Sequence, residues 1–342
     1  MPPTILNSEG KEVVLNERER FLAQNLERQI RNSLGYEVSI TTLTTIMKAI
    51  TEQKFFEIAP ADYLPVRVGE GAWSTNLLTY RSFQLSDDFT TGIINTGGNN
   101  SRLATGDAGV DSLTVKVMNW AKSIGWTIMD LEQAAKAGNW DLVTAKEQAR
   151  KKNWDLGIQK VAFLGVEGNS EVLGLYNQAG IENNTSLLSG PISDLVSSPV
   201  NLSAFIRNLL EAYRANCNRT AWPTHLIIPE SDYLGLATPS SPTYPIKSIL
   251  QLMQETFSVM TGKPFKILPN AYGDADYNDL SANRYVLLNY DEQSLRMDIP
   301  VNYTNTLANS IDNFSFQNVG YGQFTGVLAY RPLELFYFGY SA

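Results

Sequence analysis

The sequence predicts an α+β protein built from long strands, one long helix and a smaller α/β layer. Three features of the 342-residue chain indicate this fold class. A charged helical stretch ends at Gly165 and is followed by a Gly-Leu-Tyr-Asn turn at residues 174–177. Residues 295–303 alternate between apolar and polar side chains, which is the period of a strand with one buried face. A long apolar run over residues 322–339 carries a single embedded Arg-Pro pair.

The first 65 residues predict a helical arm. Asn16 followed by Glu19 has the form of a capping box. The apolar residues behind it fall four apart on one narrow stripe: Leu22, Leu26, Ile30 and Leu34. Because so narrow a stripe covers little core, we expect this helix to lie on the body of its own chain or on a neighbour.

Residues 66–115 predict a long hairpin excursion, because they are rich in Gly, Ser, Thr and Asn and carry several turn signals. Strand-like pieces at residues 77–85 and 112–120 would form its two legs. An excursion of this length inside a compact domain is generally functional or disordered. We therefore expect a projecting arm.

Two helices are expected at residues 129–137 and 141–164, with a break at Gly138. Apolar side chains recur every three or four residues along the second helix, which is the helical period. Its charged residues take the other face: Lys146, Glu147, Arg150, Lys151 and Lys152. At ~1.5 Å per residue the second helix would be ~35 Å long.

Residues 201–290 predict a small α/β layer whose sheet is covered by helices. An amphipathic helix begins behind a cap at Asn201, and a second helix follows at residues 246–257. Strands are expected at residues 224–228, 264–268, 285–289 and 295–303, on a returning segment around Phe314 and Phe316, and at residues 325–338. Pro300 places the alternating strand at a sheet edge or a bulge, and Pro332 breaks the last strand.

Charge and hydropathy narrow the class of protein. A net charge of −8 argues against binding nucleic acid by phosphate neutralisation, which needs a concentration of Lys and Arg. No segment has the apolar length of a signal peptide or of a membrane span of roughly 20 residues, so we expect a protein that is made and kept in the cytoplasm. The single cysteine, Cys217, excludes an intrachain disulfide.

No residue pattern predicts a catalytic centre, a metal site or a cofactor. The only histidine, His225, lies eight residues after Cys217, but a structural histidine and an inert buried thiol are the more frequent fates of such residues. Asp274, Asp276 and Asn278 match the first three positions of a calcium loop, but the Gly and the closing acid that such a loop requires are missing.

Taken in order, these parts resemble the major capsid proteins of tailed phages with the Hong Kong 97 fold, whose relatives include the encapsulin compartment shells. The resemblance covers residues 66–342. The residues that mark it are Asp155, Gly165, Gly174, Asn177, Arg331 and Pro332.

This resemblance implies a division of the chain into named parts. They are an N-terminal arm and lead-in at residues 1–65, an extended loop at 66–115, a peripheral domain with a spine helix at 116–200, an axial domain at 201–290, peripheral strands at 291–324 and a C-terminal strand that returns to the axial domain at 325–342.

It also implies a structural protein and no enzyme. Copies would form hexamers and pentamers that close into an icosahedral shell around double-stranded DNA, without sequence-specific binding, in a virion capsid assembled in the host cytoplasm. A separate scaffold protein is the expected partner, because the arm leaves no room for a fused one, and a decoration protein and a portal are further partners. Some family members form a crosslink from a Lys of the extended loop, and residues 66–115 contain no Lys, so no such crosslink is expected.

The resemblance places subunit contacts and hinges in the extended loop. The candidate contact residues are Trp73, Arg81, Asp87, Asp88 and Arg102, with the carboxylates expected to meet an Arg of a neighbour. A shell with both five-fold and six-fold surroundings needs flexible attachments. The candidate hinges are Gly71, Gly97, Gly98 and Gly106.

Two other functions stay open at the level of sequence. An encapsulin-like compartment would have the same fold with enzyme cargo, and nuclease-resistant DNA in purified particles would separate the two. A hydrolase carried on residues 201–290 lacks a nucleophile and base set, and it would be supported by a His225→Ala variant that lost a measured activity.

Overall fold

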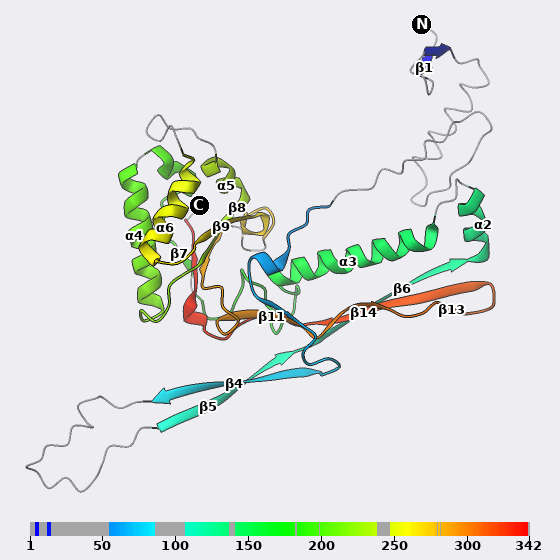
Figure 1. Ribbon diagram of the computed structural model, residues 1–342, viewed down its shortest axis with the longest axis horizontal. Coiled ribbons are helices and arrows are strands. Elements are labelled where there is room, and N and C mark those ends of the chain that lie inside the picture. Colours follow the sequence, from blue (N-terminus) through cyan, green and yellow to red (C-terminus); the bar gives the residue numbers. More distant parts are fainter. Residues whose placement is uncertain are drawn as a thin grey trace, which may run out of the picture. The chain divides into compact units, whose positions relative to one another are not determined.

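The computed structural model describes residues 4–6, 12–14, 55–85, 107–136, 141–181, 183–197, 199–237, 247–278, 280 and 282–340. Its ribbon is shown in Figure 1. The chain forms two compact units, one of residues 1–56, 123–150 and 306–319 and the other of residues 57–122, 151–305 and 320–342. The helix predicted behind Asn16 and the turn signals of residues 86–106 lie outside the described residues.

A mixed five-stranded sheet forms the α/β layer, in the order β7-β16-β10-β8-β9. Its strands are β7 (Asn183–Asn184), β8 (His225–Pro229), β9 (Lys266–Asn270), β10 (Tyr285–Leu288) and β16 (Leu335–Phe338). β8 pairs with β9, and β16 with β7, in parallel, whereas β10 is antiparallel to both of its neighbours. The expected α/β layer at residues 201–290 is therefore present, with its sheet completed by β7 and β16 from outside that range.

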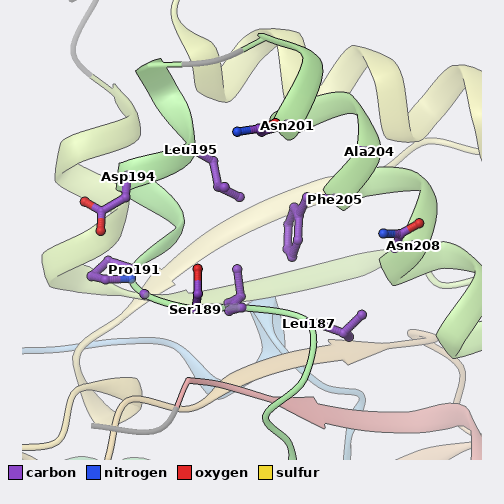
Figure 2. Close-up of a pocket in the computed structure, with 11 residues that line it drawn as sticks. Leu187, Ser189, Pro191, Asp194, Leu195, Asn201, Ala204, Phe205 and Asn208 are labelled. Carbon is purple, nitrogen blue, oxygen red and sulfur yellow. The ribbon is translucent and has the colours of Figure 1, made fainter.

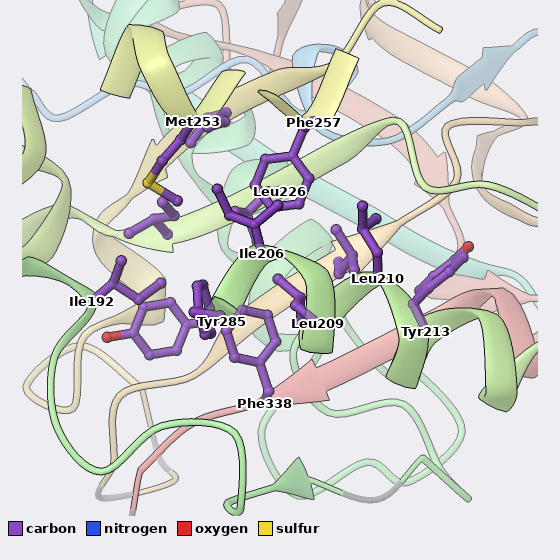
Figure 3. Close-up of a cluster of buried hydrophobic side chains, with 14 of the residues drawn as sticks. Ile192, Ile206, Leu209, Leu210, Tyr213, Leu226, Met253, Phe257, Tyr285 and Phe338 are labelled. Carbon is purple, nitrogen blue, oxygen red and sulfur yellow. The ribbon is translucent and has the colours of Figure 1, made fainter. Parts of the chain in front are cut away.

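Both faces of this sheet are buried. On one face, α4 (Pro199–Asn216) and α6 (Ile249–Thr261) pack on alternate strand residues that include Leu226, Tyr285 and Phe338 (Figure 3). On the other face, the intervening residues Ile227 and Val286 belong to a second hydrophobic cluster. Strands that are buried on two sides need continuous apolar runs, which explains the sequence of β8, β10 and β16.

The long helix α3 (Leu142–Leu164) ends in the turn that marks the sequence. The carbonyl oxygens of Ala162 and Phe163 accept hydrogen bonds from the backbone N–H groups of Leu175 and Tyr176, at 2.8 and 3.0 Å. Asn177 Nδ2 donates to the next free carbonyl, that of Leu164, at 2.7 Å. The last turn of a helix leaves such carbonyls without partners, and here the Gly-Leu-Tyr-Asn turn provides them.

Two glycines permit this closure. Gly165 has a φ of +77°, a left-handed conformation that ends the helix. At Gly174 a Cβ atom would lie 2.4 Å from the backbone of Phe163, so only glycine allows the two segments to come this close. Gly174 N–H also donates to Asn177 Oδ1 at 2.6 Å.

The alternating segment at residues 295–303 forms two strands instead of one. β11 (Leu295–Ile299) lies between β3 (Val66–Val68) and β15 (Val327–Ala329), whereas β12 (Val301–Asn305) joins the sheet of β13 (Asn309–Ser310) and β14 (Ser315–Phe324). The chain changes sheet at Pro300, which lacks the N–H needed to continue a ladder. β6 (Met118–Thr127) pairs with β14.

Apart from the two hairpin strands described in the next subsection, the remaining elements are short. They are β1 (Thr4–Leu6), β2 (Glu12–Val14), α2 (Ile128–Lys136), α5 (Glu230–Ala237) and the 3-10 helices η1 (Pro60–Asp62), η3 (Ile192–Ser197), η4 (Ala271–Gly273) and η5 (Pro332–Glu334). β1 and β2 pair antiparallel as a sheet of their own.

Several predicted boundaries were wrong. Asn201 lies inside α4 and does not cap it, because the helix already begins at Pro199, a residue suited to a first turn. α6 starts after Ser248, whose side chain accepts the N–H of Gln251, and it runs on to Thr261. α5 was missed, because its eight residues give no clear helical period. The last predicted strand is split into β15 and β16 around η5, which begins at Pro332.

The predicted charged face of α3 is also interrupted. Arg150 is buried, with 2% of its surface exposed, because its guanidinium donates to the backbone and side-chain oxygens of Asn318 at 3.0 and 2.9 Å. Glu147 accepts a hydrogen bond from the Asn318 amide. A buried Arg is tolerated when its donors are satisfied in this way.

Candidate functional site

The predicted hairpin is present as a two-stranded sheet. β4 (Asn76–Leu85) pairs with β5 (Asp107–Lys116) along ten residues, from Asn76 opposite Lys116 to Leu85 opposite Asp107. The second leg lies earlier in the chain than predicted, because it ends at Lys116 and β6 starts a different pairing at Met118. Val117, between them, is buried and donates its N–H to Thr75 O at 3.0 Å.

The two faces of the hairpin differ in exposure. Cross-strand partners share a face, so the register assigns Leu78, Tyr80 and Val110 to one side. We call this side the outer face, and these three side chains are 53%, 67% and 67% exposed. On the opposite side, Val115 is buried and Thr79 half-buried. The outer face thus leaves large apolar side chains in water.

A tight turn precedes the hairpin and presents Trp73. Gly69, Gly71 and Trp73 have φ values of +95°, +77° and +66°. Gly69 N–H donates to Ile299 O at 3.0 Å. At Gly71 the φ of +77° favours glycine, and an added Cβ atom would also lie 2.2 Å from Leu77 Cδ2 unless that side chain moved. Trp73 is 69% exposed.

A buried glutamine, Gln323, fixes the backbone of Trp73. Its N–H donates to Gln323 Oε1 at 2.7 Å, and Gln323 is itself buried and donates to Asn119 Oδ1 at 2.6 Å. The indole ring lies against Tyr321 with the ring centroids 5.7 Å apart.

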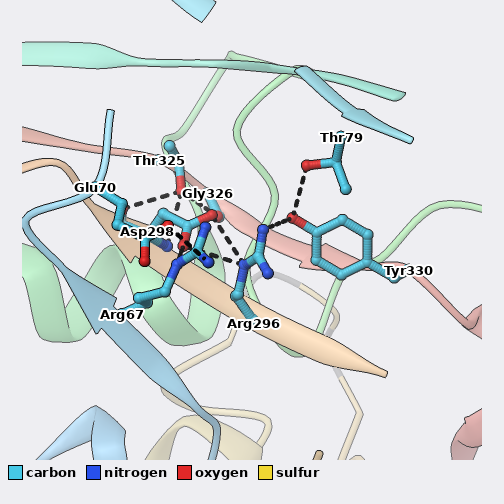
Figure 4. A network of polar contacts seen from close by, with 8 residues as sticks. All are labelled: Arg67, Glu70, Thr79, Arg296, Asp298, Thr325, Gly326 and Tyr330. Atoms are coloured by element: carbon cyan, nitrogen blue, oxygen red, sulfur yellow. Dashed lines mark hydrogen bonds and ion pairs between the residues drawn. The ribbon is translucent and has the colours of Figure 1, made fainter. Parts of the chain in front are cut away.

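An ionic network supports the base of the hairpin (Figure 4). The buried carboxylate of Asp298 accepts from Arg67 Nε at 3.2 Å and from Arg296 Nε at 3.1 Å. Arg296 also donates to Tyr330 OH at 2.6 Å, and this hydroxyl lies 3.5 Å from Thr79 Oγ1 on β4. The network therefore reaches from β3 and β11 to the hairpin.

Two further ion pairs lie at the rim of this region. Arg67 pairs with Glu70 at 2.8 Å, and Lys116 at the end of β5 pairs with Glu171 at 2.6 Å. Both partners of the second pair are about half exposed, with 51% and 59% of their side-chain surfaces accessible. Pairs of this kind contribute ~0–1 kcal/mol, so they add little to the attachment of the hairpin.

The structure describes only part of the predicted site. Trp73 and Gly71 are in the turn, and Arg81 lies in β4 opposite Asp111. The other predicted contacts and hinges lie outside the described residues: Asp87, Asp88, Gly97, Gly98, Arg102 and Gly106. The sequence offered no signal for the roles of Gln323 and Asp298, since Gln323 meets Trp73, and Asp298 meets Arg67, across more than 200 residues of chain.

The markers Arg331 and Pro332 lie at the junction before β16. Pro332 begins η5, and Arg331 contacts Glu334 at 3.4 Å, Asp291 at 3.8 Å and Gln293 Oε1 at 3.2 Å. Asp155, another of the marker residues, lies on α3 with an exposed side chain. Partial shielding of its carboxyl from water raises its pKa.

A pocket of about 300 Å³ lies between α4 and residues 187–195 (Figure 2). Phe205 and Leu188 are among its apolar lining residues, and Ser189 and Asp194 are among its polar lining residues. His225, the single histidine of the chain, does not line it. The pocket thus lacks a histidine base to pair with its serine.

His225 and Cys217 have structural surroundings. The His225 ring stacks on Tyr290 with centroids 4.8 Å apart, and its Nδ1 lies 3.0 Å from Thr224 Oγ1. Burial, and to a lesser degree the charge of Lys266, lowers the pKa of His225 to about 4. Cys217 is buried, with its Sγ 3.4 Å from the carbonyl oxygen of Ala221.

The calcium-like spacing at residues 274–278 has another use. The Asp274 carboxylate accepts the N–H groups of Glu230 and Ser231 at 3.2 and 3.4 Å, at the start of α5. Asn278 donates to the carbonyl oxygens of Gly273 and Ala282 at 3.2 and 3.1 Å. Among the described residues, no group of three or more His, Cys, Asp or Glu is placed to hold a metal ion.

The helices in the described part of the chain are too short or too polar to cross a membrane. No curated protein sequence matches the chain significantly. The model of the family "Major capsid protein" matches residues 92–340.

The chain belongs to this major capsid protein family.

Three solved structures have the same fold as this capsid protein. The capsid of Myoviridae phage XM1 superposes with a TM-score of 0.70 at 17% identity, covering 90% of this chain and 100% of the other. A structure from Mycobacterium phage Adephagia gives 0.55 at 12% identity, with 89% and 99% covered. The capsid of an empty GTA particle gives 0.54 at 10% identity, with 88% and 96% covered. The Hong Kong 97-like fold class predicted from the sequence is thereby confirmed.

Proposed function

We propose that this capsid protein assembles through hexamers and pentamers into an icosahedral shell that encloses double-stranded DNA. The β4–β5 hairpin carries the proposal. An isolated two-stranded sheet is marginally stable in water, and this one exposes Leu78, Tyr80 and Val110 on its outer face. Contact with a neighbouring copy would bury that face, as expected of an obligate assembly whose interfaces exceed ~2,000 Å².

We assign the parts of the chain as the resemblance implies. Residues 1–65 act as the arm and lead-in, 66–115 as the extended loop, 116–200 and 291–324 as the peripheral domain, 201–290 as the axial domain and 325–342 as its returning strand. In the loop, Trp73, Arg81, Asp87, Asp88 and Arg102 make subunit contacts, and Gly71, Gly97, Gly98 and Gly106 adjust the loop to five-fold and six-fold surroundings.

The proposed partners and location complete this function. Assembly takes place in the host cytoplasm with a separate scaffold protein, and a decoration protein and a portal join the virion capsid. The net charge of −8 supports an inner wall that does not grip the enclosed DNA. The role is structural and not enzymatic, a proposal supported by the pocket lining and by the surroundings of His225.

The decisive measurement is the mass and appearance of the purified protein. We expect light scattering after size exclusion, followed by electron microscopy, to find megadalton closed particles or rings of five or six subunits. A single species near 38.0 kDa at high concentration, with and without a co-expressed scaffold, would contradict the proposal. Particles from the native host should hold nuclease-resistant DNA, and its absence would favour an encapsulin-like compartment.

A further inference from the structure

We propose that Trp73 is an anchor side chain of the contact between neighbouring copies of this chain. The inference rests on the proposed shell function and assigns to one of its candidate contact residues the role of an energetic anchor. Its basis is that the fold holds a large aromatic side chain in a strained backbone conformation without burying it.

The backbone conformation of Trp73 is unfavourable for this residue type. A φ of +66° is rare for any residue with a side chain and is an outlier for a bulky one. Gly69 and Gly71, in the same turn, take their left-handed conformations without this penalty. Such strain persists only where the surroundings hold it in place, and it concentrates at functional positions.

The surroundings of Trp73 do hold it in place. Gln323 accepts the Trp73 N–H at 2.7 Å, and its side-chain amide is fixed in turn by Asn119 at 2.6 Å. Gln323 lies in β14 opposite Val301 of β12. Because it belongs to a paired strand, Gln323 cannot move with the turn if the turn relaxes. A buried Gln with both ends of its amide engaged is a rigid support.

Stability of the subunit does not account for the ring. With 69% of its surface exposed, Trp73 belongs to neither hydrophobic cluster, and its ring lies tilted against that of Tyr321. Val68, five residues before it, is also about half exposed, at 51%. Trp, together with Tyr and Arg, is enriched among the energetic anchors of protein interfaces.

The occupant that fits this surface is a second copy. Trp73 lies three residues before β4 begins, so its surface continues along the chain into the exposed outer face of the hairpin. Nucleic acid is a poorer fit, because a stacking platform needs free basic residues. The nearest one in sequence, Arg67, is paired with Glu70 and with Asp298.

The test compares Trp73→Ala and Trp73→Gly with Tyr277→Ala, which removes an aromatic side chain of similar exposure, 65%, on the same unit. Both Trp73 variants should lower the assembly equilibrium constant by about tenfold or more, whereas Tyr277→Ala should assemble like the wild type. The unassembled Trp73→Gly subunit should melt no lower than the wild type, because glycine adopts a φ of +66° freely.

Fluorescence quenching gives an independent readout. The difference between wild type and Trp73→Phe isolates the Trp73 emission, which acrylamide should quench in subunits and not in particles. Protection by duplex DNA in subunits, without protection in particles, would overturn the proposal in favour of nucleic acid. Loss of assembly together with a lower melting temperature of Trp73→Gly would overturn it in favour of a role in the fold.

The two levels of the proposal fail differently. If the wild type forms particles and Trp73→Ala forms them equally well, the anchor is wrong and the shell function stands. If the wild type forms no particles under any condition, the shell function fails and the anchor fails with it.

Discussion

Gly174 is required by a close contact between two backbone segments. Because it has no Cβ, the chain can come within hydrogen-bonding distance of the end of α3. The sequence predicted that this glycine marks the fold, but not why. The reason depends on a contact between segments that only the folded chain brings together.

Gly174→Ala should therefore destabilise the subunit by about 3 kcal/mol, since the new methyl group would meet the Phe163 backbone and not a side chain that could move away. Gly157→Ala is the matched control. Gly157 lies inside α3 with nothing within 4 Å of its added Cβ, so alanine should stabilise by about 0.5–1 kcal/mol through helix propensity. Urea unfolding of the unassembled subunits measures both, and equal effects would refute the explanation.

His225 should make the subunit sensitive to acid. Its pKa is about 4 in the fold and about 6.5 when unfolded, so the unfolded state binds the proton first as the pH falls. The stability that depends on neutral His225 is complete above pH ~6.5 and is lost progressively down to pH ~4, with a maximum loss of roughly 3 kcal/mol.

Replacing His225 with Gln should flatten this part of the stability profile relative to the wild type. Comparing the two proteins at each pH removes the contribution of other groups, such as Asp232, whose raised pKa acts in the opposite direction. Parallel profiles for wild type and variant between pH 4 and 6.5 would show that His225 is not the sensitive group.

Elements were predictable where one period dominates, and misjudged where the chain changes partners. The β8 and β10 strands and the helix α3 follow from apolar runs and from helical spacing. The segment at residues 295–303 keeps one strand period throughout, but Pro300 divides it between two sheets. Periodicity describes which side of a strand is buried, and it contains no information on which strand lies beside it.

Asp298 illustrates the limit of the pattern. Its position on the polar side of β11 predicts exposure, yet only 4% of its surface is accessible, because Arg67 and Arg296 enclose its carboxylate. A charge can be buried when oppositely charged donors surround it. The partners come from β3 and from β11 itself, and the first of these is 231 residues away in the chain.

Asp298→Asn should destabilise the subunit by about 2 kcal/mol, since Arg296 would lose its carboxylate partner in a mostly buried setting and Arg67 would keep only the exposed Glu70. Asp291→Asn serves as the control, because Asp291 meets Arg331 at 3.8 Å with both side chains about half exposed. That change should stay within about 0.5 kcal/mol. Thermal unfolding of the two variants compares them directly, and a similar small effect for both would rule out a supporting role for the network.

At the scale of the whole molecule, the fold class and the family could be recognised from the order of the parts, although each signal is weak alone. The sequence predicted only part of the candidate site. Trp73 was predicted only as a candidate contact residue of the loop, whereas its left-handed backbone and its support by Gln323 depend on pairing between β12 and β14.

Assembled particles should contain no covalent crosslink that starts from the extended loop, since residues 66–115 lack lysine. Boiling in detergent is therefore expected to release a single band near 38.0 kDa on a denaturing gel. A ladder of oligomers that survives boiling would disprove this, and mass spectrometry of the bands would then locate the linkage.

The place of β16 in its sheet bears on the timing of folding during synthesis. β16 lies between β7 and β10, in the interior of the order, and it leaves the ribosome after every other strand of that sheet. Until β16 has been made, β7 lacks the strand that it pairs with. One hydrophobic cluster then lacks Phe336 and Phe338, and the other lacks Leu335 and Tyr337. A nascent chain therefore cannot present a finished α/β surface to its neighbours before β16 has been made, which delays association on polysomes until then.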